Sequence, residues 1–318
     1  MKWGILSTAA IAKKALIPAL QRAEDAEVDA IASQNGKERE VAEEFGIPKA
    51  YSSYELLLAD EEIEAVYIPL PNHLHKEWTI KAAEAGKHVL CEKPAALKAQ
   101  DVEDMITACK QNQVYFLEAF MYQFHPQHER VKQLIEEGAI GDVGLVRASF
   151  SFHFNRDSNN IRLDVNKGGG ALWDVGCYGI HSALHVLSQE VKNVNAVAHI
   201  DDKFGVDTTA VATLMLEDET IVQVDCSFDG VPRNEYEVIG TKGMIKVHDA
   251  YRPDKKDHQG IVTIQTENGT EEMIIEGDQY RLQVETFMNA IQRQESFVDY
   301  HRETVRYIEV MEDLQQLL

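Results

Sequence analysis

The sequence has no apolar run that approaches the roughly 20 residues needed to cross a bilayer, so we expect no membrane-spanning helix. Cysteine is also scarce. The four cysteines are scattered through apolar contexts with no CxxC pair: Cys91, Cys109, Cys177 and Cys226. This spacing argues against a disulfide framework and against a cysteine-based metal site. We therefore expect reduced thiols, no bound metal and a cytoplasmic location.

Basic residues are outnumbered, with 31 lysines and arginines against 53 aspartates and glutamates, for a net charge of −22. A surface this acidic repels phosphate backbones, so neither nucleic acid nor a membrane surface is an expected partner. The chain opens directly on a strand-like segment, residues 3–7, and we expect no signal peptide. The remaining partners are small molecules and other protein chains.

The 318 residues are enough for two cores, and 44% hydrophobic with 26% charged residues is typical of a globular protein. Short apolar runs alternate with helical patterns through the first 120 residues. Strands are predicted at 3–7, 28–32, 65–69, 88–91 and 114–117, and helices at 11–22, 37–45, 73–85 and 99–111. Repeated βα units predict a parallel, Rossmann-type sheet covered on both faces.

The pattern changes near residue 121, where longer strands with alternating polarity begin. Residues 222–228 alternate apolar and polar side chains, which indicates a strand with one wet face. Strands are predicted at 143–154, 193–201, 208–216, 222–228, 236–240, 244–247 and 261–266, and helices at 131–137, 171–187, 283–293 and 303–317. The predicted fold is α/β overall. A dinucleotide-binding domain spans 1–121, and an α+β domain with a large, mostly antiparallel open sheet spans 122–318, for substrate binding and oligomerisation.

The turn after the first strand occupies the place of the glycine-rich dinucleotide loop but lacks its glycines. Ser7, Thr8, Ala9 and Ile11 stand there, at the start of a helix. Small residues at this place let backbone N–H groups reach a pyrophosphate. The alternative is an ordinary βα turn, and the surrounding βαβ pattern favours the cofactor.

The end of the second strand lacks the acid that commonly holds the ribose 2′-hydroxyl of NAD. The residues there are Ser33 and Gln34, followed by Lys37 and Arg39. A serine bonds a 2′-phosphate and the cations neutralise it, whereas a carboxylate repels it. This favours NADP, with NAD as the alternative, unless the loop is polar without touching a cofactor.

A further turn, Pro71, Asn72 and His75, follows the strand at 65–69. Pro71 and Asn72 suit a helix start with Asn72 as N-cap. Ligands gather at the carboxyl edge of parallel sheets, so these residues are also predicted to border the cofactor.

Lys93 ends the strand at 88–91 within Glu92-Lys93-Pro94. A lysine that faces a cleft from a strand end lowers the pKa of a nearby phenol or alcohol. The alternative is a surface lysine paired with Glu92. Proline fixes the local turn, and a cis bond is compatible with it.

The segment after Gly168-Gly169-Gly170 places Asp174, Tyr178 and His181 at i, i+4 and i+7. These spacings stack the three polar side chains on one helical face. The glycines let the backbone approach a neighbour closely before the helix begins. The alternative is a first-turn acid with a core tyrosine and a core histidine.

These motifs together resemble the Gfo/Idh/MocA family of nicotinamide-dependent oxidoreductases over essentially the whole chain. Glu92-Lys93-Pro94 and the segment from Gly168 to Tyr178 match family motifs, with Tyr178 in place of a commoner histidine. That tyrosine, and Ser7 and Ala9 in place of glycines, are shared with a branch resembling dimeric dihydrodiol dehydrogenase, glucose-fructose oxidoreductase and aldose dehydrogenases.

The resemblance implies roles for individual residues. Tyr178 is the acid/base, with Lys93 and Asp174 beside it as catalytic residues. His181, and Arg162 within residues 159–163, are implied to bind substrate. Glu92 and Lys93 join the cofactor set with Ser7, Thr8, Ala9, Ile11, Ser33, Gln34, Lys37, Pro71, Asn72 and His75.

The implied activity is hydride transfer between NADP or NAD and a hydroxyl or carbonyl of a sugar, polyol or cyclic diol. Two other functions fit the same scaffold: a glycosidase that oxidises transiently and retains its cofactor, and a nucleotide- or sugar-sensing regulator without catalysis. The wet strand faces need cover, so we expect a homodimer or a larger homo-oligomer.

Overall fold

The computed structural model describes residues 1–156 and 160–318, so Asn159 of the segment 159–163 lies outside the described residues. The chain forms two compact units. The first comprises Met1–Met121 and Tyr280–Val305, and the second Tyr122–Gln279 and Arg306–Leu318. Residues 280–305, predicted from the sequence to belong to the second domain, thus pack with the first. The physical reason is an apolar contact between buried rings, since the Phe287 ring lies 5.6 Å from the Trp3 ring.

The first unit is built on a six-stranded parallel sheet of order β3-β2-β1-β4-β5-β6. The strands are β1 (Lys2–Leu6), β2 (Glu27–Ala32), β3 (Lys49–Tyr51), β4 (Ala65–Ile68), β5 (His88–Glu92) and β6 (Phe116–Ala119). The predicted Rossmann-type sheet is confirmed. The strand order reverses between β1 and β4, which is where ligands bind in such sheets.

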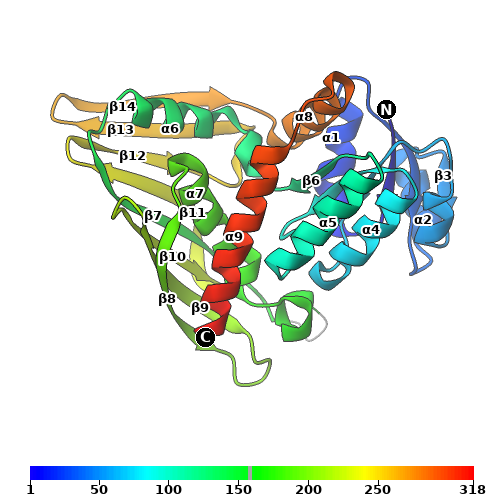
Figure 1. The fold of residues 1–318 in the computed structure, drawn as a ribbon, viewed down its shortest axis with the longest axis horizontal. Helices are drawn as coiled ribbons and strands as arrows, with labels where there is room; N and C mark the ends of the chain where they lie inside the picture. The colour runs from blue at the N-terminus through cyan, green and yellow to red at the C-terminus, as the bar shows by residue number, and fades with distance from the viewer. Residues whose placement is uncertain (157–159) are drawn as a thin grey trace. The chain divides into compact units, whose positions relative to one another are not determined.

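Helices cover the faces of this sheet, and α4 and α5 pack side by side (Figure 1). They are α1 (Ile17–Arg22), α2 (Glu38–Phe45), α3 (Tyr54–Leu58), α4 (His75–Glu84), α5 (Ala99–Gln111) and α8 (Gln279–Arg293). A π turn, Ala12–Leu16, precedes α1, and a 3-10 turn, Asn72–Leu74, precedes α4. Strand β3 and helix α3 escaped prediction because three and five residues are too few to show a period.

The second unit is built on an eight-stranded sheet of order β14-β13-β12-β11-β7-β10-β9-β8, antiparallel except for the parallel pair β10 and β7. Its strands are β7 (Val143–His153), β8 (Val191–Ile200), β9 (Asp207–Leu216), β10 (Ile221–Ser227), β11 (Asp229–Gly240), β12 (Gly243–His248), β13 (Gln259–Thr266) and β14 (Gly269–Glu276). The predicted large sheet is confirmed. Strand β14 was missed because most of its side chains are exposed.

One face of this sheet carries α6 (Pro126–Glu136) and α7 (Cys177–Leu187), as Figure 1 shows. Along β10, Val222, Val224 and Cys226 are buried, whereas Gln223 is exposed. Two 3-10 turns, η4 (Ile161–Leu163) and η5 (Val165–Lys167), and a π turn, η6 (Leu172–Gly176), precede α7, and the last helix is α9 (Val298–Gln316).

All four cysteines are free and buried. Within the described ranges, no helix has both the length and the apolar character that crossing a membrane requires.

Candidate active site

The turn after β1 has the backbone shape of a glycine turn although a serine stands there. Ser7 has φ 151°, a conformation that glycine adopts without strain and other residues rarely do. Its Oγ accepts the backbone N–H of Ala9 at 3.1 Å. Ser7, Thr8, Ala9 and Ile11 are all partly exposed. The turn at the reversal of strand order is therefore shaped and open for a pyrophosphate.

The turn after β2 is tied to this loop and holds an acid that the sequence motif did not reveal. Asn35 Nδ2 donates to Thr8 Oγ1 at 3.2 Å, so the two predicted cofactor loops lie together. Ser33 is 2% exposed, and its hydroxyl donates to Glu38 Oε2 at 2.7 Å. This hydrogen bond lowers the pKa of Glu38 and keeps it ionised. Glu38 begins α2, five residues beyond Ser33, outside the interval where the acid is usually sought.

The neighbouring predicted residues Gln34 and Lys37 have exposed side chains on the same turn. The Lys37 backbone N–H donates to Asn35 Oδ1 at 3.1 Å, which fixes the turn and leaves the ammonium to solvent. A phosphate on the ribose would find a cation here, but also the carboxylate of Glu38.

His75 does not have the geometry of a direct cofactor ligand. It is fully buried, with Nδ1 2.9 Å from the carbonyl oxygen of Pro94 and Nε2 2.7 Å from that of Leu70. Burial lowers the pKa of His75, and the ring joins the loops after β4 and β5. Asn72 also differs from prediction: it is the first residue of the 3-10 turn, and Pro71 occupies the N-cap position.

Lys93 follows β5 with a partly exposed side chain and a cis peptide bond to Pro94. Its backbone N–H donates to Glu92 Oε2 at 3.2 Å. Glu92 accepts a short hydrogen bond from the Tyr67 hydroxyl, and burial raises the pKa of Glu92. The Tyr67 hydroxyl and the Lys93 backbone thus hold the Glu92 carboxylate. The Lys93 ammonium, whose charge acts against the rise in the pKa of Glu92, belongs to the residue that follows β5.

In the second unit, Arg162 and Asp174 form an ion pair, with Nε 2.6 Å from Oδ2. The neighbouring Asp174 carboxylate raises the pKa of Arg162, and the phenol of Tyr178 contributes in the same direction. Interaction between two charges is mutual, so the guanidinium favours the ionised form of Tyr178 as well. The predicted Arg162, Asp174 and Tyr178 therefore form one electrostatic group.

The predicted helical stripe is modified by the π turn Leu172–Gly176, which widens the first turn. Asp174, Tyr178 and His181 consequently meet three different surroundings. Tyr178 is 6% exposed, and its ring lies 5.2 Å from the rings of Phe150 and Tyr251. Its phenol is set in a nearly dry aromatic cluster, where electrostatic effects are strong.

His181 is 2% exposed, and its Nδ1 lies 2.6 Å from the hydroxyl oxygen of Tyr122. The Tyr122 ring also lies 5.8 Å from that of Tyr178. Tyr122 was not predicted from the sequence, because it stands alone near the expected domain boundary. His181 thus holds Tyr122 next to Tyr178 in the same aromatic cluster.

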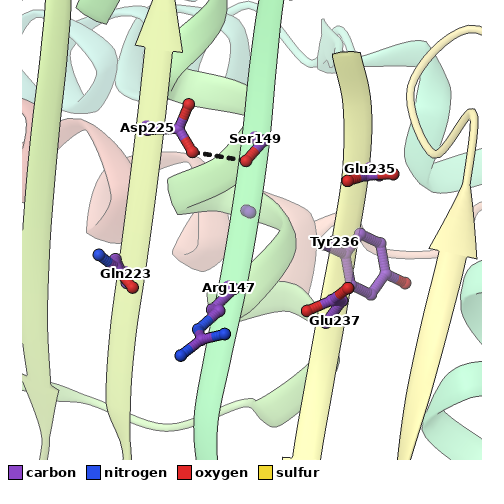
Figure 2. Close-up of a pocket in the computed structure, with 8 residues that line it drawn as sticks. Arg147, Ser149, Gln223, Asp225, Glu235, Tyr236 and Glu237 are labelled. Carbon is purple, nitrogen blue, oxygen red and sulfur yellow. Dashed lines mark hydrogen bonds between the residues drawn. The ribbon is translucent and has the colours of Figure 1, made fainter.

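A polar hollow lies on the face of the second sheet away from α7. Figure 2 shows Arg147 and Ser149 on β7, Asp225 on β10, and Glu235 and Glu237 on β11 around it. The Ser149 hydroxyl donates to Asp225 at 2.5 Å. The residues that line this hollow carry charges of both signs, and none of them is a predicted catalytic residue. We therefore interpret the hollow as ordinary protein surface and not as the active site.

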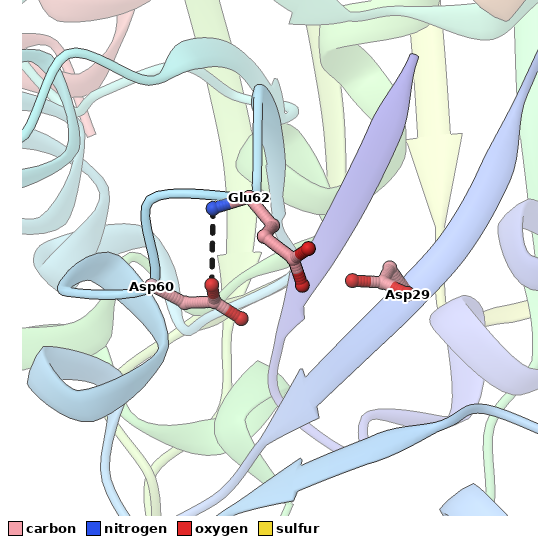
Figure 3. Close-up of side chains that lie close together, drawn as sticks. All are labelled: Asp29, Asp60 and Glu62. Carbon is pink, nitrogen blue, oxygen red and sulfur yellow. Dashed lines mark hydrogen bonds between the residues drawn. The ribbon is translucent and has the colours of Figure 1, made fainter.

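Three carboxylates also gather in the first unit, Asp29, Asp60 and Glu62 (Figure 3). The ammonium of Lys49 already lies among them, 3.0 Å from Asp29 and 2.8 Å from Asp60, with Glu62 closer still. These hydrogen bonds raise the pKa of Lys49. The cluster is an ion-pair network in which a lysine takes the place that a cation would need.

Two family models match this chain. Residues 1–120 match the oxidoreductase family model with an NAD-binding Rossmann fold, and residues 128–246 match the GFO/IDH/MocA C-terminal domain. D-xylose 1-dehydrogenase (NADP(+)) 2 of Haloferax volcanii is 38% identical over 93% of this chain and 90% of its own length. Trans-1,2-dihydrobenzene-1,2-diol dehydrogenase of Mus musculus is 32% identical over 80% of this chain and 76% of its own length.

Among solved structures, a 3-ketoreductase from Actinomadura kijaniata in complex with NADP and TDP-benzene superposes with a TM-score of 0.94. The identity is 29%, and the match covers 99% of this chain and 97% of that one. Together, the two family models and these similarities show that the chain belongs to the GFO/IDH/MocA family of oxidoreductases.

Proposed function

We propose that this oxidoreductase transfers a hydride between NADP, with NAD as the alternative, and a hydroxyl or carbonyl group of a sugar, polyol or cyclic diol. The observation that carries the proposal is the setting of Tyr178, a phenol in a dry aromatic cluster within the electrostatic reach of Arg162. The Haloferax and mouse relatives, named for xylose and dihydrodiol oxidation, support the substrate class.

The chain has the features that a dinucleotide needs. The glycine-like backbone at Ser7, with partly exposed Thr8 and Ala9 beside it, suits a pyrophosphate at the start of a helix. Ser33, Gln34 and Lys37 would meet the 2′-phosphate of NADP. When bound, the nicotinamide supplies the hydride chemistry.

The protein's own part is proton transfer and orientation. In the direction of oxidation, Tyr178 accepts the proton of the substrate hydroxyl, and Arg162, in the same unit, stabilises the phenolate. Asp174, oriented by Arg162, accepts a hydrogen bond from a neighbouring substrate hydroxyl. Lys93, at the carboxyl end of β5 in the first unit, stays a predicted catalytic residue.

The test is to follow absorbance of the reduced nicotinamide with NADP and NAD across aldoses, inositols and cyclic diols. Tyr178→Phe is expected to lower kcat by about 10²–10⁴-fold while dinucleotide binding survives. Tyr251→Phe is the matched control: it removes a buried hydroxyl that bonds Ser182 in the same aromatic cluster, and it should leave kcat nearly unchanged. Equal turnover of wild type and Tyr178→Phe would refute the assignment.

The same assay separates the alternatives. Sugar release without net change in nicotinamide absorbance would indicate a cofactor-retaining glycosidase. Tight dinucleotide binding without turnover on any substrate would indicate a regulator.

The open sheet face supports a homodimer or larger homo-oligomer. One row across that face runs through Val197, Val211, Asp225, Ser149 and Glu235 by strand register, and Val197 is 70% exposed. On the same face Arg147 lies near the acidic Asp225 and Glu235, and apolar side chains beside charges of both signs suit a self-complementary two-fold contact. Light scattering should give a mass above that of one chain, and Val197→Asp should reduce it. A monomeric wild type would contradict this part of the proposal.

A further inference from the structure

The N-terminus of the helical segment that carries Tyr178 is held by a carboxylate from another element. Asp207, the first residue of β9, is 3% exposed. Its Oδ2 accepts the backbone N–H of Leu172 at 2.7 Å, and the N–H of Ala171 also donates to it. The first N–H groups of a helix have no partner within the helix, and a negative charge there is favourable. Asp207 therefore acts as the cap of this segment.

The glycines before the segment make room for the carboxylate. Gly170 has φ +108°, and a Cβ on it would overlap Oδ1 of Asp207. A Cβ on Gly169 would lie 2.7 Å from the carbonyl oxygen of Arg162 and 2.8 Å from that of Asp164. The glycines thus allow two close contacts with the backbone, one made by Asp207 and one made by the turn that carries Arg162.

The cap also fixes the rotation of the following π turn about the helix axis, and therefore the directions of its side chains. Leu172 opens this turn, and the Asp174 N–H donates to the carbonyl oxygen of Gly170 at 3.1 Å. The same backbone then places the Asp174 carboxylate on Arg162 and, after Gly176, the Tyr178 ring in its aromatic cluster. A rotation of the first turn would move Asp174 and Tyr178 together.

Burying a carboxylate this deeply is unfavourable, since burial raises the pKa of Asp207 to about 6. Its titratable neighbours are thiols: Cys226 on β10 interacts with it electrostatically, and Cys177 of α7 faces Cys226. The backbone N–H groups of Ala171 and Leu172 compensate for the lost water. Because burying the Asp207 carboxylate is unfavourable, its presence at this helix start indicates that the position of the helix matters.

We propose that Asp207 is a positioning residue for the reaction: by holding the backbone at Ala171 and Leu172, it fixes where Asp174 and Tyr178 stand. This inference rests on the proposed function for its kinetic consequence and on geometry alone for its structural one. It assigns a role to a strand residue that belongs to no active-site motif.

The kinetic test compares three variants. Asp207→Ala removes the acceptor and should lower kcat by about 10²-fold, the scale of a misplaced catalytic group, with the dinucleotide Kd unchanged. Asp207→Asn keeps an acceptor oxygen and should recover most of kcat. Asp218→Ala, an exposed aspartate in the β9–β10 turn, is the matched control and should behave as wild type. Wild-type kcat in Asp207→Ala would overturn the proposal.

If Asp207→Ala does not fold, Gly170→Ala probes the same contact from the other side. It should lower kcat with unchanged dinucleotide Kd, and wild-type kcat in that variant would equally overturn the proposal. Hydrogen exchange at the Leu172 amide needs no substrate: it should be slow in wild type and at least about tenfold faster in Gly170→Ala or Asp207→Ala. A wild type without turnover would therefore sink the proposed function, while the amide exchange would still decide the role of Asp207.

Discussion

Arg162 Nε donates to Asp174 Oδ2 at 2.6 Å, which joins the turn Ile161–Leu163 to the π turn Leu172–Gly176. Arg162 also lies 5.8 Å from the Phe154 ring, so its guanidinium is held on two sides. A fixed guanidinium beside Asp174 and within electrostatic reach of Tyr178 offers a cation to the proposed acid/base from the same unit.

Arg162→Gln should make Tyr178 harder to ionise, because a positive charge favours the phenolate. The rising limb of the pH profile of alcohol oxidation should move to higher pH, with kcat at neutral pH falling by about tenfold. The measurement is kcat between about pH 6 and 10. Arg156→Gln, which breaks an ion pair with Asp201 at 2.7 Å, is the control and should leave the profile in place. A higher KM with an unmoved profile would restrict Arg162 to substrate binding.

Glu38→Gln should tighten NADP binding more than NAD binding. The Glu38 carboxylate engages Ser33, the serine proposed for the 2′-phosphate, and repels a second negative charge. At about 4 Å such repulsion is worth about 1 kcal/mol even in water, so the ratio of the two dissociation constants should change by about five- to tenfold.

The two dissociation constants are measured by titrating protein fluorescence with each dinucleotide. Glu40→Gln, an exposed glutamate on the same helix, is the control for a general change of charge. An equal change for NADP and NAD would show that Glu38 does not face the 2′ position.

Asp207→Asn should stabilise the protein relative to wild type as the pH rises. The pKa of Asp207 is raised from its ordinary value of 3.8 to about 6, so the folded state binds more protons than the unfolded state between these values. The free energy of unfolding contributed by Asp207 therefore falls as pH rises through this window, by up to about 3 kcal/mol. Urea unfolding of both proteins near the two ends of the window should show this difference. A constant difference would mean that Asp207 titrates normally.

Much of the fold could be predicted because local patterns determine it. Strands buried on both faces give the apolar runs of the first sheet, and alternation gives the wet strands of the second. The return of residues 280–305 to the first unit has no local signal, since it depends on a contact between Trp3 and Phe287 that are far apart in sequence. Most side chains of strand β14 are exposed, so it carries no burial pattern.

The candidate site divides in the same way. Residues within motifs, such as Lys93 and Tyr178, could be singled out from spacing and resemblance. Asp207 could not, because Leu172 becomes its neighbour only through folding, and Glu38 could not, because it lies outside the interval where the cofactor motif places an acid. His75 shows the converse: it lies within a motif, yet both of its ring nitrogens face buried backbone carbonyl oxygens.

Lys49→Met tests whether the acidic cluster of Asp29, Asp60 and Glu62 is structural. Asp29 has a side chain only 5% exposed, and removing the ammonium leaves it with Lys2 at 3.8 Å as its cation. A buried charge that loses its partner is strongly destabilising, whereas Lys192→Met breaks an exposed pair with Glu219 and should matter little. Thermal unfolding at neutral pH should therefore separate the two variants clearly.

The pH dependence of that difference is also determined. Lys49 lowers the pKa of Asp60 to about 2, so the stabilisation is present above the ordinary value of 3.8 and is lost as pH falls toward 2. The difference in unfolding temperature between wild type and Lys49→Met should accordingly become smaller at acidic pH. If the carboxylates served a divalent cation instead, Mg²⁺ would raise the unfolding temperature of wild type at neutral pH. Lys49 occupies that place, so Mg²⁺ should have no such effect on wild type.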